Sequence, residues 1–306
     1  MNKHRYFEGW YFKNVSAHGE HSWSFIPGIS LTKEQSHAFV QAINGTTGKT
    51  FYFRFDISQC SFLRDRFQVR IGNNLFSDKG FSLDLDDGVN RFSGQLEFSE
   101  MTRHKATLRR PGIMGWYRYV PLMECYHGVV SLDHKLSGSL RCNDEDINFN
   151  NGRGYIEKDW GSSMPESWIW MQSNHFEKPG TSFMLSVARI PWIGKTFTGF
   201  LGYFHHLGKT ITFATYTGAK IRIADYSTNS VNISIKSGSV QIEITGHNQS
   251  AAPLMAPVMG EMERVIHESI NAVLNVRITN KAGEILFEGA GINGGMEMAG
   301  EMSLLL

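Results

Sequence analysis

Apolar and polar residues alternate along much of the chain, and this period of two predicts β-strands. The clearest case is a pair of segments, 231–236 and 240–244, in which every second residue is apolar. A short turn containing Gly238 joins them, so together they predict a β-hairpin. The same alternation runs through the segments 51–55, 81–85, 129–140 and 272–278.

Turn residues punctuate these runs, and no sustained helical period is found. Thirty-one glycines and Asn-Gly pairs such as Asn44-Gly45 mark the turns. The best helical candidate is 254–266, but Pro257 and Gly260 interrupt it, so it predicts a short helix or a loop. Many short strands with regular turn signals indicate an all-β protein with little helix, either a sandwich or a barrel.

Composition and charge narrow the class of partner. Lys and Arg number 30 against 29 Asp and Glu, a net charge of +1, so no nucleic-acid partner is expected. The basic residues at the N-terminus are not followed by an apolar h-region, so no signal peptide is expected. No run approaches the roughly 18 apolar residues of a membrane span, so no membrane helix is expected. The three cysteines lack CxxC spacing, which favours a reduced, cytoplasmic setting. They are Cys60, Cys125 and Cys142.

The densest chemistry lies at mid-chain, in the segment 154–163 with the sequence GYIEKDWGSS. On an extended strand Tyr155, Glu157 and Asp159 share one face, and the residues between them point the other way. Two neighbouring carboxylates repel when both are ionised, and burial adds to this effect, so one of them can stay protonated at neutral pH. We therefore predict Glu157, Asp159 and Tyr155 as catalytic residues, with one carboxylate as a general acid.

A second aromatic run follows closely, and its alternation predicts a wall of indole and amide side chains. Trp168, Trp170, Gln172 and Asn174 fall on one face of the next strand. Protonating an alkene creates a carbocation, which an indole face stabilises by roughly 0.5 to 2 kcal/mol, and the amides can orient a phenol or quinol oxygen. We predict these four residues and Trp10 as substrate-binding residues. For Trp10 the alternative is packing in the core.

Histidines and a further glutamate supply the remaining candidates. Glu124 and His127 are three residues apart, so on a regular strand they point to opposite faces. Each is predicted to reach the ligand singly, or else to make a structural hydrogen bond. The adjacent pair His205-His206 diverges on a strand and has no third ligand at informative spacing. The chain also has no phosphate loop, GxSxG elbow or HExxH helix, so we expect no metal and no cofactor.

Four segments resemble the signature segments of the tocopherol cyclase family. They are FEGWYFK from residue 7, GWY from 115 with Pro121, YIEKDWG from 155 before Pro165, and WIWMQSNHF from 168. The resemblance implies two consecutive lipocalin-like antiparallel β-barrels, which we place at 1–164 and 165–306. It also implies acid-initiated cyclisation, or a related addition to a double bond, of an apolar prenylated or polyene small molecule. Tocopherol cyclases close a chroman ring by adding a phenol across a prenyl double bond, and the wider group includes carotenoid hydratases.

Two alternatives stay open. The charged motif could be a structural ion-pair network in which Lys158 bonds a carboxylate of the N-terminal segment such as Glu8, with Trp160 also structural. The protein could also be a noncatalytic carrier of a lipid or isoprenoid, because lipocalin-like barrels hold ligands without chemistry.

The C-terminal part concentrates methionine, a flexible apolar residue that adapts to irregular ligands. The segments 254–260 and 296–302 could cover a barrel mouth, touch a membrane transiently, or simply fill gaps in the core. The expected partner is an apolar small molecule, and the oligomeric state stays open. Reserve candidates for the acid are Glu268, Glu297 and Glu301.

Overall fold

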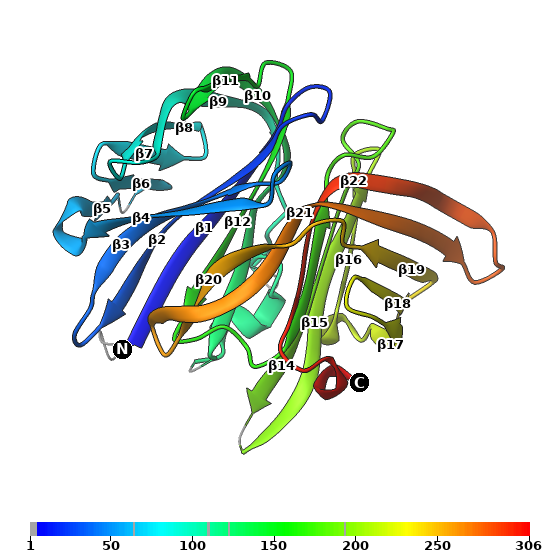
Figure 1. The fold of residues 1–306 in the computed structure, drawn as a ribbon. Helices are drawn as coiled ribbons and strands as arrows, with labels where there is room; N and C mark the ends of the chain where they lie inside the picture. Colours follow the sequence, from blue (N-terminus) through cyan, green and yellow to red (C-terminus); the bar gives the residue numbers. More distant parts are fainter. Residues whose placement is uncertain (1–4, 64, 109–110, 122, 193) are drawn as a thin grey trace. The chain divides into compact units, whose positions relative to one another are not determined.

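The computed structural model is almost entirely β-structure, arranged in two compact units (Figure 1). It describes residues 5–63, 65–108, 111–121, 123–192 and 194–306. The first unit consists of the chain up to Arg103 together with His127–Met164 and Leu254–Val265. The second unit consists of His104–Tyr126, Pro165–Pro253 and Ile266–Leu306.

The first unit is built on an antiparallel sheet in the order β4-β3-β2-β1-β12-β10-β9-β8-β7-β6-β5, with β11 beside β10. The 3-10 turn η1 (Ile57–Gln59) joins the two end strands in sequence, and the Gly72 N–H donates to the Gln59 carbonyl at 3.0 Å. The strands are β1 (Arg5–Val15), β2 (Ser22–Thr32), β3 (His37–Asn44), β4 (Lys49–Asp56), β5 (Cys60–Phe62), β6 (Gln68–Ile71), β7 (Asn74–Ser77), β8 (Gly80–Asp86), β9 (Arg91–Thr102), β10 (Cys125–Cys142), β11 (Glu145–Asn148) and β12 (Arg153–Gly161).

The second sheet repeats this plan in the order β16-β15-β14-β13-β22-β21-β19-β18-β17, with β20 beside β21. Most of β20 and the start of β21 fall in Leu254–Val265, which belongs to the first unit. In both sheets the first strand of the unit pairs with the last, β1 with β12 and β13 with β22. The strands are β13 (Trp168–Ser173), β14 (Ser182–Trp192), β15 (Lys195–His206), β16 (Lys209–Ala214), β17 (Lys220–Tyr226), β18 (Ser230–Ser237), β19 (Val240–His247), β20 (Ala252–Val258), β21 (Glu261–Asn280) and β22 (Ile285–Ala299). Further 3-10 turns are η2 (Gly115–Tyr119), η3 (Thr215–Thr217) and η4 (Met302–Leu305).

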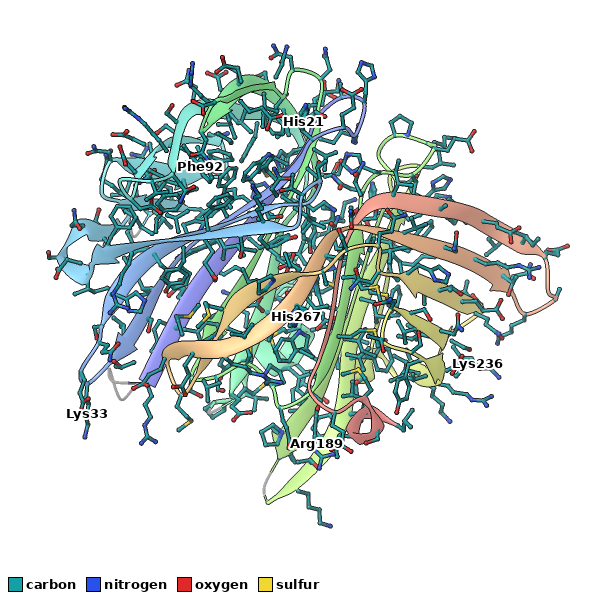
Figure 2. All side chains as sticks on the ribbon, viewed as in Figure 1. His21, Lys33, Phe92, Arg189, Lys236 and His267 are labelled. Carbon is teal, nitrogen blue, oxygen red and sulfur yellow. The ribbon has the colours of Figure 1, made fainter. Side chains whose placement is uncertain are left out.

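Strand alternation determines which side chains enter each core. In β8 the apolar residues Phe81, Leu83 and Leu85 are buried, whereas Asp84 and Asp86 are exposed. Fully burying a large apolar side chain contributes about 1.5 to 3 kcal/mol relative to exposure. The first core combines aliphatic side chains with many aromatic ones, and Phe92 (Figure 2) is among its fully buried members. The second core is mainly aliphatic and methionine-containing.

The predicted all-β, lipocalin-like fold with little helix is confirmed, and so is the hairpin, which forms β18 and β19. The short helix or loop predicted at 254–266 is wrong, because this segment forms β20 and the start of β21. Proline is tolerated here because β20 pairs only with β21, leaving its other edge without a ladder partner among the described strands. Gly260, at φ 90°, makes the turn between the two strands.

The two compact units share one boundary with the predicted domains, between Met164 and Pro165. Each unit also includes a segment from beyond that boundary, as given above. Among the described residues, no helix has the length and apolar character needed to cross a membrane.

Candidate functional site

Strand β12 carries the acidic motif on one face. Its register with β1 pairs Glu157 with Tyr11 and Lys158 with Trp10, so these two pairs lie on opposite faces of the sheet. The hydroxyl of Tyr155 is fully buried and donates a hydrogen bond to Oε2 of Glu157 at 2.6 Å. The alternation along β12 therefore places Tyr155 and Glu157 on the same side, and this bond fixes the orientation of the Glu157 carboxylate.

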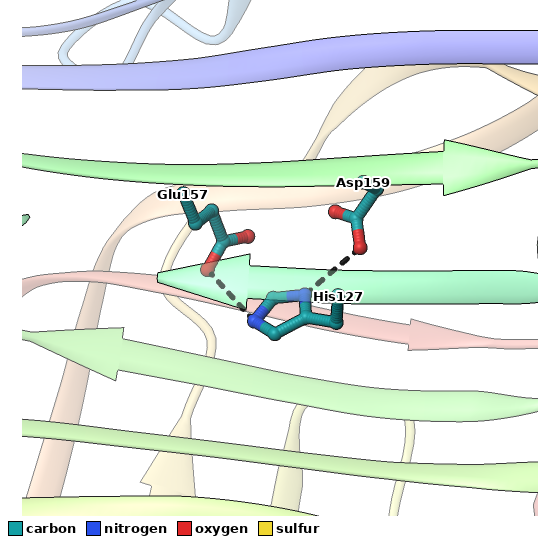
Figure 3. A group of neighbouring side chains, drawn as sticks. All are labelled: His127, Glu157 and Asp159. Carbon is teal, nitrogen blue, oxygen red and sulfur yellow. Dashed lines mark hydrogen bonds and ion pairs between the residues drawn. The ribbon is translucent and has the colours of Figure 1, made fainter. Parts of the chain in front are cut away.

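His127 of β10 lies between the two carboxylates of β12 (Figure 3). Its Nδ1 is 2.8 Å from Oδ1 of Asp159, and its Nε2 is 3.5 Å from Oε2 of Glu157. The side chains of His127 and Glu157 are only 11% and 6% exposed, against 26% for Asp159. We call these three residues the His127 cluster.

The short contact in the His127 cluster shows where a proton is held. Two bare acceptor atoms repel at 2.8 Å, so a proton lies between Nδ1 of His127 and Oδ1 of Asp159. A carboxylate that accepts from one ring nitrogen fixes the orientation of the ring and aims the other nitrogen, here toward Glu157. The arrangement is therefore a hydrogen-bonded acid–base group in which Glu157 is buried and His127 and Asp159 are partly buried.

The same three residues are also the group of potential metal ligands in the described part of the chain, since their donor atoms lie within 4.8 Å of one another. Two ligand atoms on one Zn²⁺ ion, each about 2.0 to 2.1 Å from it, lie roughly 3.3 Å apart in tetrahedral geometry. The 2.8 Å contact between His127 and Asp159 is shorter than that. These two atoms would have to separate before both could bind one ion, so the geometry fits a shared proton better. The expected absence of a metal stays a prediction.

The opposite face of β12 carries a second charged group. Lys158 forms an ion pair with Glu8, and the Tyr6 hydroxyl donates to Oε2 of Glu8 at 2.5 Å. The Lys158 ammonium is 4.8 Å from the ring centroid of Trp10 and 5.0 Å from that of Trp160. Burial, and then the bond to Glu8, raise the pKa of Tyr6. The ion pair that we considered as the structural alternative is thus present, on the face away from Glu157.

Trp10, predicted as a substrate-binding residue, lies in the core of the first unit. It is 4% exposed, and its ring packs against Phe62 and Phe67, with centroids 5.5 and 5.8 Å away. Its contact with Lys158 links this core to the charged group. Core packing accounts for these contacts, and a role in substrate binding stays a prediction.

The aromatic and amide residues of β13 lie in the second unit. Trp168, Trp170 and Gln172 of β13 are buried, and so is Asn174, which directly follows the strand. Every residue of β13 is buried, on both faces of the strand. The indole N–H of Trp168 donates to Oε2 of Glu297 at 2.5 Å, and the Gln172 amide donates to Asn174 at 3.5 Å. Their role in substrate binding stays a prediction.

Two of the reserve acids meet in the second unit. Glu268 of β21 stands directly opposite Glu297 of β22 in the antiparallel register, so their side chains point to the same face. Glu268 is 1% exposed. Glu301 is an exposed residue just before η4. No local pattern predicts the pairing between Glu268 and Glu297, because the two residues are 29 positions apart.

Glu124 lies in a bend before β10, not within a strand as expected, and it belongs to the second unit. Burial, and then the charge of Glu166, raise the pKa of Glu124.

Each histidine of the pair on β15 forms a hydrogen bond with a threonine hydroxyl. Nδ1 of His205 lies 2.7 Å from Oγ1 of Thr210, and Nδ1 of His206 lies 2.8 Å from Oγ1 of Thr181.

A family model described as tocopherol cyclase-like matches residues 95–300. A probable chloroplastic tocopherol cyclase of Oryza sativa subsp. japonica is 23% identical over 309 residues, which cover 83% of this chain and 65% of the rice protein. A chloroplastic tocopherol cyclase of Zea mays is 29% identical over 111 residues, which cover 34% of this chain and 23% of the maize protein. The chain thus spans slightly less than two thirds of the rice protein and under a quarter of the maize protein.

Solved structures share the fold at low sequence identity. CghA in complex with Sch210972 has a TM-score of 0.61 and 10% identity, covering 97% of this chain and 89% of CghA. A putative AttH from Nitrosomonas europaea has a TM-score of 0.53 and 14% identity, covering 98% and 94%. Kievitone hydratase from Nectria haematococca has a TM-score of 0.52 and 9% identity, covering 96% and 89%. At such identities these structures support the lipocalin-like fold alone.

Proposed function

Because the chain belongs to the tocopherol cyclase-like family, we propose that it catalyses acid-initiated addition to a carbon–carbon double bond of an apolar prenylated or polyene small molecule, closing a ring. The observation that carries this proposal is the His127 cluster, in which a partly buried histidine lies between Glu157 and Asp159. The cluster lies within the segment that the family model matches. It offers a positioned proton, which is what such a reaction requires.

The reaction that we propose consumes one proton and returns it. A proton from the His127 cluster forms a C–H bond at the less substituted alkene carbon, and the π electrons of the alkene make that bond. The tertiary cation that remains is attacked by a phenol oxygen of the same molecule, which forms the new C–O bond. The phenolic proton then returns to the cluster, so the product is an isomer of the substrate. Because no electrons enter or leave, the step needs no redox partner.

Each member of the cluster has a distinct part in this proposal. Asp159 holds the ring of His127 in one orientation through the 2.8 Å bond, and Glu157 faces the other ring nitrogen. Tyr155 holds Glu157 in place through its hydroxyl. The cluster can therefore give a proton from one atom and take one back at another without rearranging, which is how positioned acid–base groups accelerate proton transfer.

The test is turnover of a panel of prenyl-quinols and polyenes by the wild type and by Glu157→Gln, Asp159→Asn and His127→Gln. Glu97→Gln is the matched control, because Glu97 is an exposed glutamate on β9 of the same unit. Loss of a positioned acid should lower kcat/KM by about 10²- to 10⁴-fold, and the control should match the wild type. Full turnover in both carboxylate variants would show that the acid lies elsewhere.

Isotopes separate ring closure from hydration, the reaction named for the structural neighbour kievitone hydratase. In D₂O both reactions place one deuterium on carbon, since both begin with the same protonation. In water labelled with ¹⁸O only hydration adds the heavy oxygen to the product.

Native mass spectrometry of protein purified from its own host tests the alternative that the protein is a noncatalytic carrier. An unchanged ligand that stays tightly bound, without turnover, would favour a carrier.

A further inference from the structure

We propose that Lys158 is a positioning residue, which holds strands β1, β10 and β12 together from one face of the sheet so that the His127 cluster keeps its geometry on the other. This inference rests on the proposed function for its kinetic consequences. The structural part, that Lys158 controls the surroundings of His127, is testable without any turnover.

The first observation is that Lys158 lies on β12 between the two acids of the cluster. Glu157 precedes it and Asp159 follows it, and alternation sends their side chains to the opposite face. Any shift or twist of β12 at Lys158 therefore moves both carboxylates relative to His127. A one-residue slip in register would reverse every side chain of the strand.

The second observation is that Lys158 bonds across the β1–β12 ladder. Its ammonium pairs with Glu8, whose cross-strand partner in the register is Trp160, and it lies over the ring of Trp10, its own cross-strand partner. Tyr6 holds the second oxygen of Glu8. The ammonium thus contacts a carboxylate and an indole of β1 at once, which fixes β12 against β1 at this level.

The third observation connects Lys158 to the strand of His127. The Lys158 ammonium also lies over the ring of Trp160, 5.0 Å from its centroid. That ring packs on Gly128, where an added Cβ would stand 3.3 Å from the Trp160 ring. Gly128 directly follows His127 on β10. The contacts therefore run from Lys158 through Trp160 to the residue beside His127.

The arrangement predicts what happens when the charge is removed. Lys158→Met keeps an unbranched chain that fits between the indoles but has no ammonium to bond Glu8. The β1–β12 ladder remains, but β12 loses its side-chain bond to Glu8 of β1, and Trp160 loses the cation that it packs against. A misplacement of about 1 Å in a catalytic group can cost on the order of 100-fold in rate. We expect kcat to fall about 10- to 100-fold, with a smaller change in KM.

The decisive measurement is the pH titration of the His127 ring by NMR of ¹⁵N-histidine-labelled protein. The His127→Gln spectrum assigns the signal. We compare the wild type with Lys158→Met, the conservative Lys158→Arg, and Lys135→Met as a matched control. Lys135 also lies on β10 in this unit, but its ion pair with Glu100 is exposed. If Lys158→Met does not fold, the double variant Glu8→Gln/Lys158→Met takes its place, because it leaves no carboxylate without its partner.

A positioning role predicts that removal of the Lys158 charge shifts the His127 titration and the pH profile of turnover, that Lys158→Arg restores both in large part, and that Lys135→Met changes neither. Folded Lys158→Met, or the folded double variant, with a wild-type His127 titration would overturn the proposal. If the wild type turns over none of the substrates, the proposed function fails, and the His127 titration still decides whether Lys158 positions the cluster.

Discussion

His134 should make the first unit sensitive to acid. Its side chain is 1% exposed, and its Nδ1 bonds Ser131 at 2.9 Å. Its Nε2 has no hydrogen-bond partner among the described residues and lies against Gly154. The ring also stacks on Phe98, with centroids 4.3 Å apart. Charging the imidazole would place an N–H donor in these surroundings without an acceptor, and burial accordingly lowers the pKa of His134 from 6.5 to about 3.

The sign and the size of the effect follow from linkage. Between the two pKa values the unfolded chain binds a proton at His134 and the folded chain does not, so stability falls as pH falls below 6.5. At pH 5 the medium is one and a half units below the unfolded pKa, and each unit is worth about 1.4 kcal/mol. The loss between pH 7 and pH 5 is therefore about 2 kcal/mol. It hardly depends on the folded pKa while that value stays below about 4.

The assay is urea denaturation at pH 7 and pH 5, followed by tryptophan fluorescence. His134→Gln removes the titrating group but keeps a polar side chain beside Ser131, and the exposed His267→Gln controls for loss of a histidine. The wild type should lose about 2 kcal/mol more than His134→Gln between the two pH values. Equal losses in the wild type and His134→Gln would refute the reasoning, whatever the absolute stability of the variant.

Three further substitutions test single contacts. Tyr155→Phe removes the donor to buried Glu157 and should destabilise the protein by about 1.5 to 3 kcal/mol in denaturant melts; an unchanged midpoint would contradict a bond of that strength. Gly154→Ala places a Cβ 2.3 Å from Nε2 of His134, and this overpacking should lower the free energy of unfolding by about 1 to 3 kcal/mol. Gly180→Ala is the comparison: it has open space around the added Cβ but a φ of 79°, so its loss of stability reports backbone strain alone. Trp168→Phe removes the indole N–H that bonds Glu297 and should cost about 1.5 to 3 kcal/mol by thermal denaturation, a result that an unchanged melting temperature would exclude.

The strand content was readable in the sequence because it is a local property. The hairpin of β18 and β19 follows from alternation and a glycine turn alone. The grouping of Tyr155 with Glu157 follows equally from the two-residue period of one strand. The lipocalin-like arrangement came from the resemblance to a family, since alternation does not specify which strands pair.

The contacts that define the candidate site could not be read in this way. His127 reaches Glu157 and Asp159 because β10 and β12 are neighbours in the sheet although a further strand, β11, lies between them in sequence. No local pattern reports such a pairing. The prediction for the segment 254–266 is wrong for a related reason. Pro257 and Gly260 indicate a short helix or a loop, whereas a strand accepts proline only where one edge is left unpaired, which depends on the sheet order.

The pairing of the first strand of the unit with its last has a consequence for folding. Trp10 and Lys158 are direct partners across this ladder, 148 residues apart. Bringing such distant segments together costs about 4 kcal/mol of chain entropy, beyond a constant, before any contact compensates for it. Contacts of this range slow folding, so the β1–β12 ladder is expected to close after the local hairpins. On a ribosome, the His127 cluster therefore cannot form until β12 has been synthesised, because two of its three residues, Glu157 and Asp159, lie on that strand.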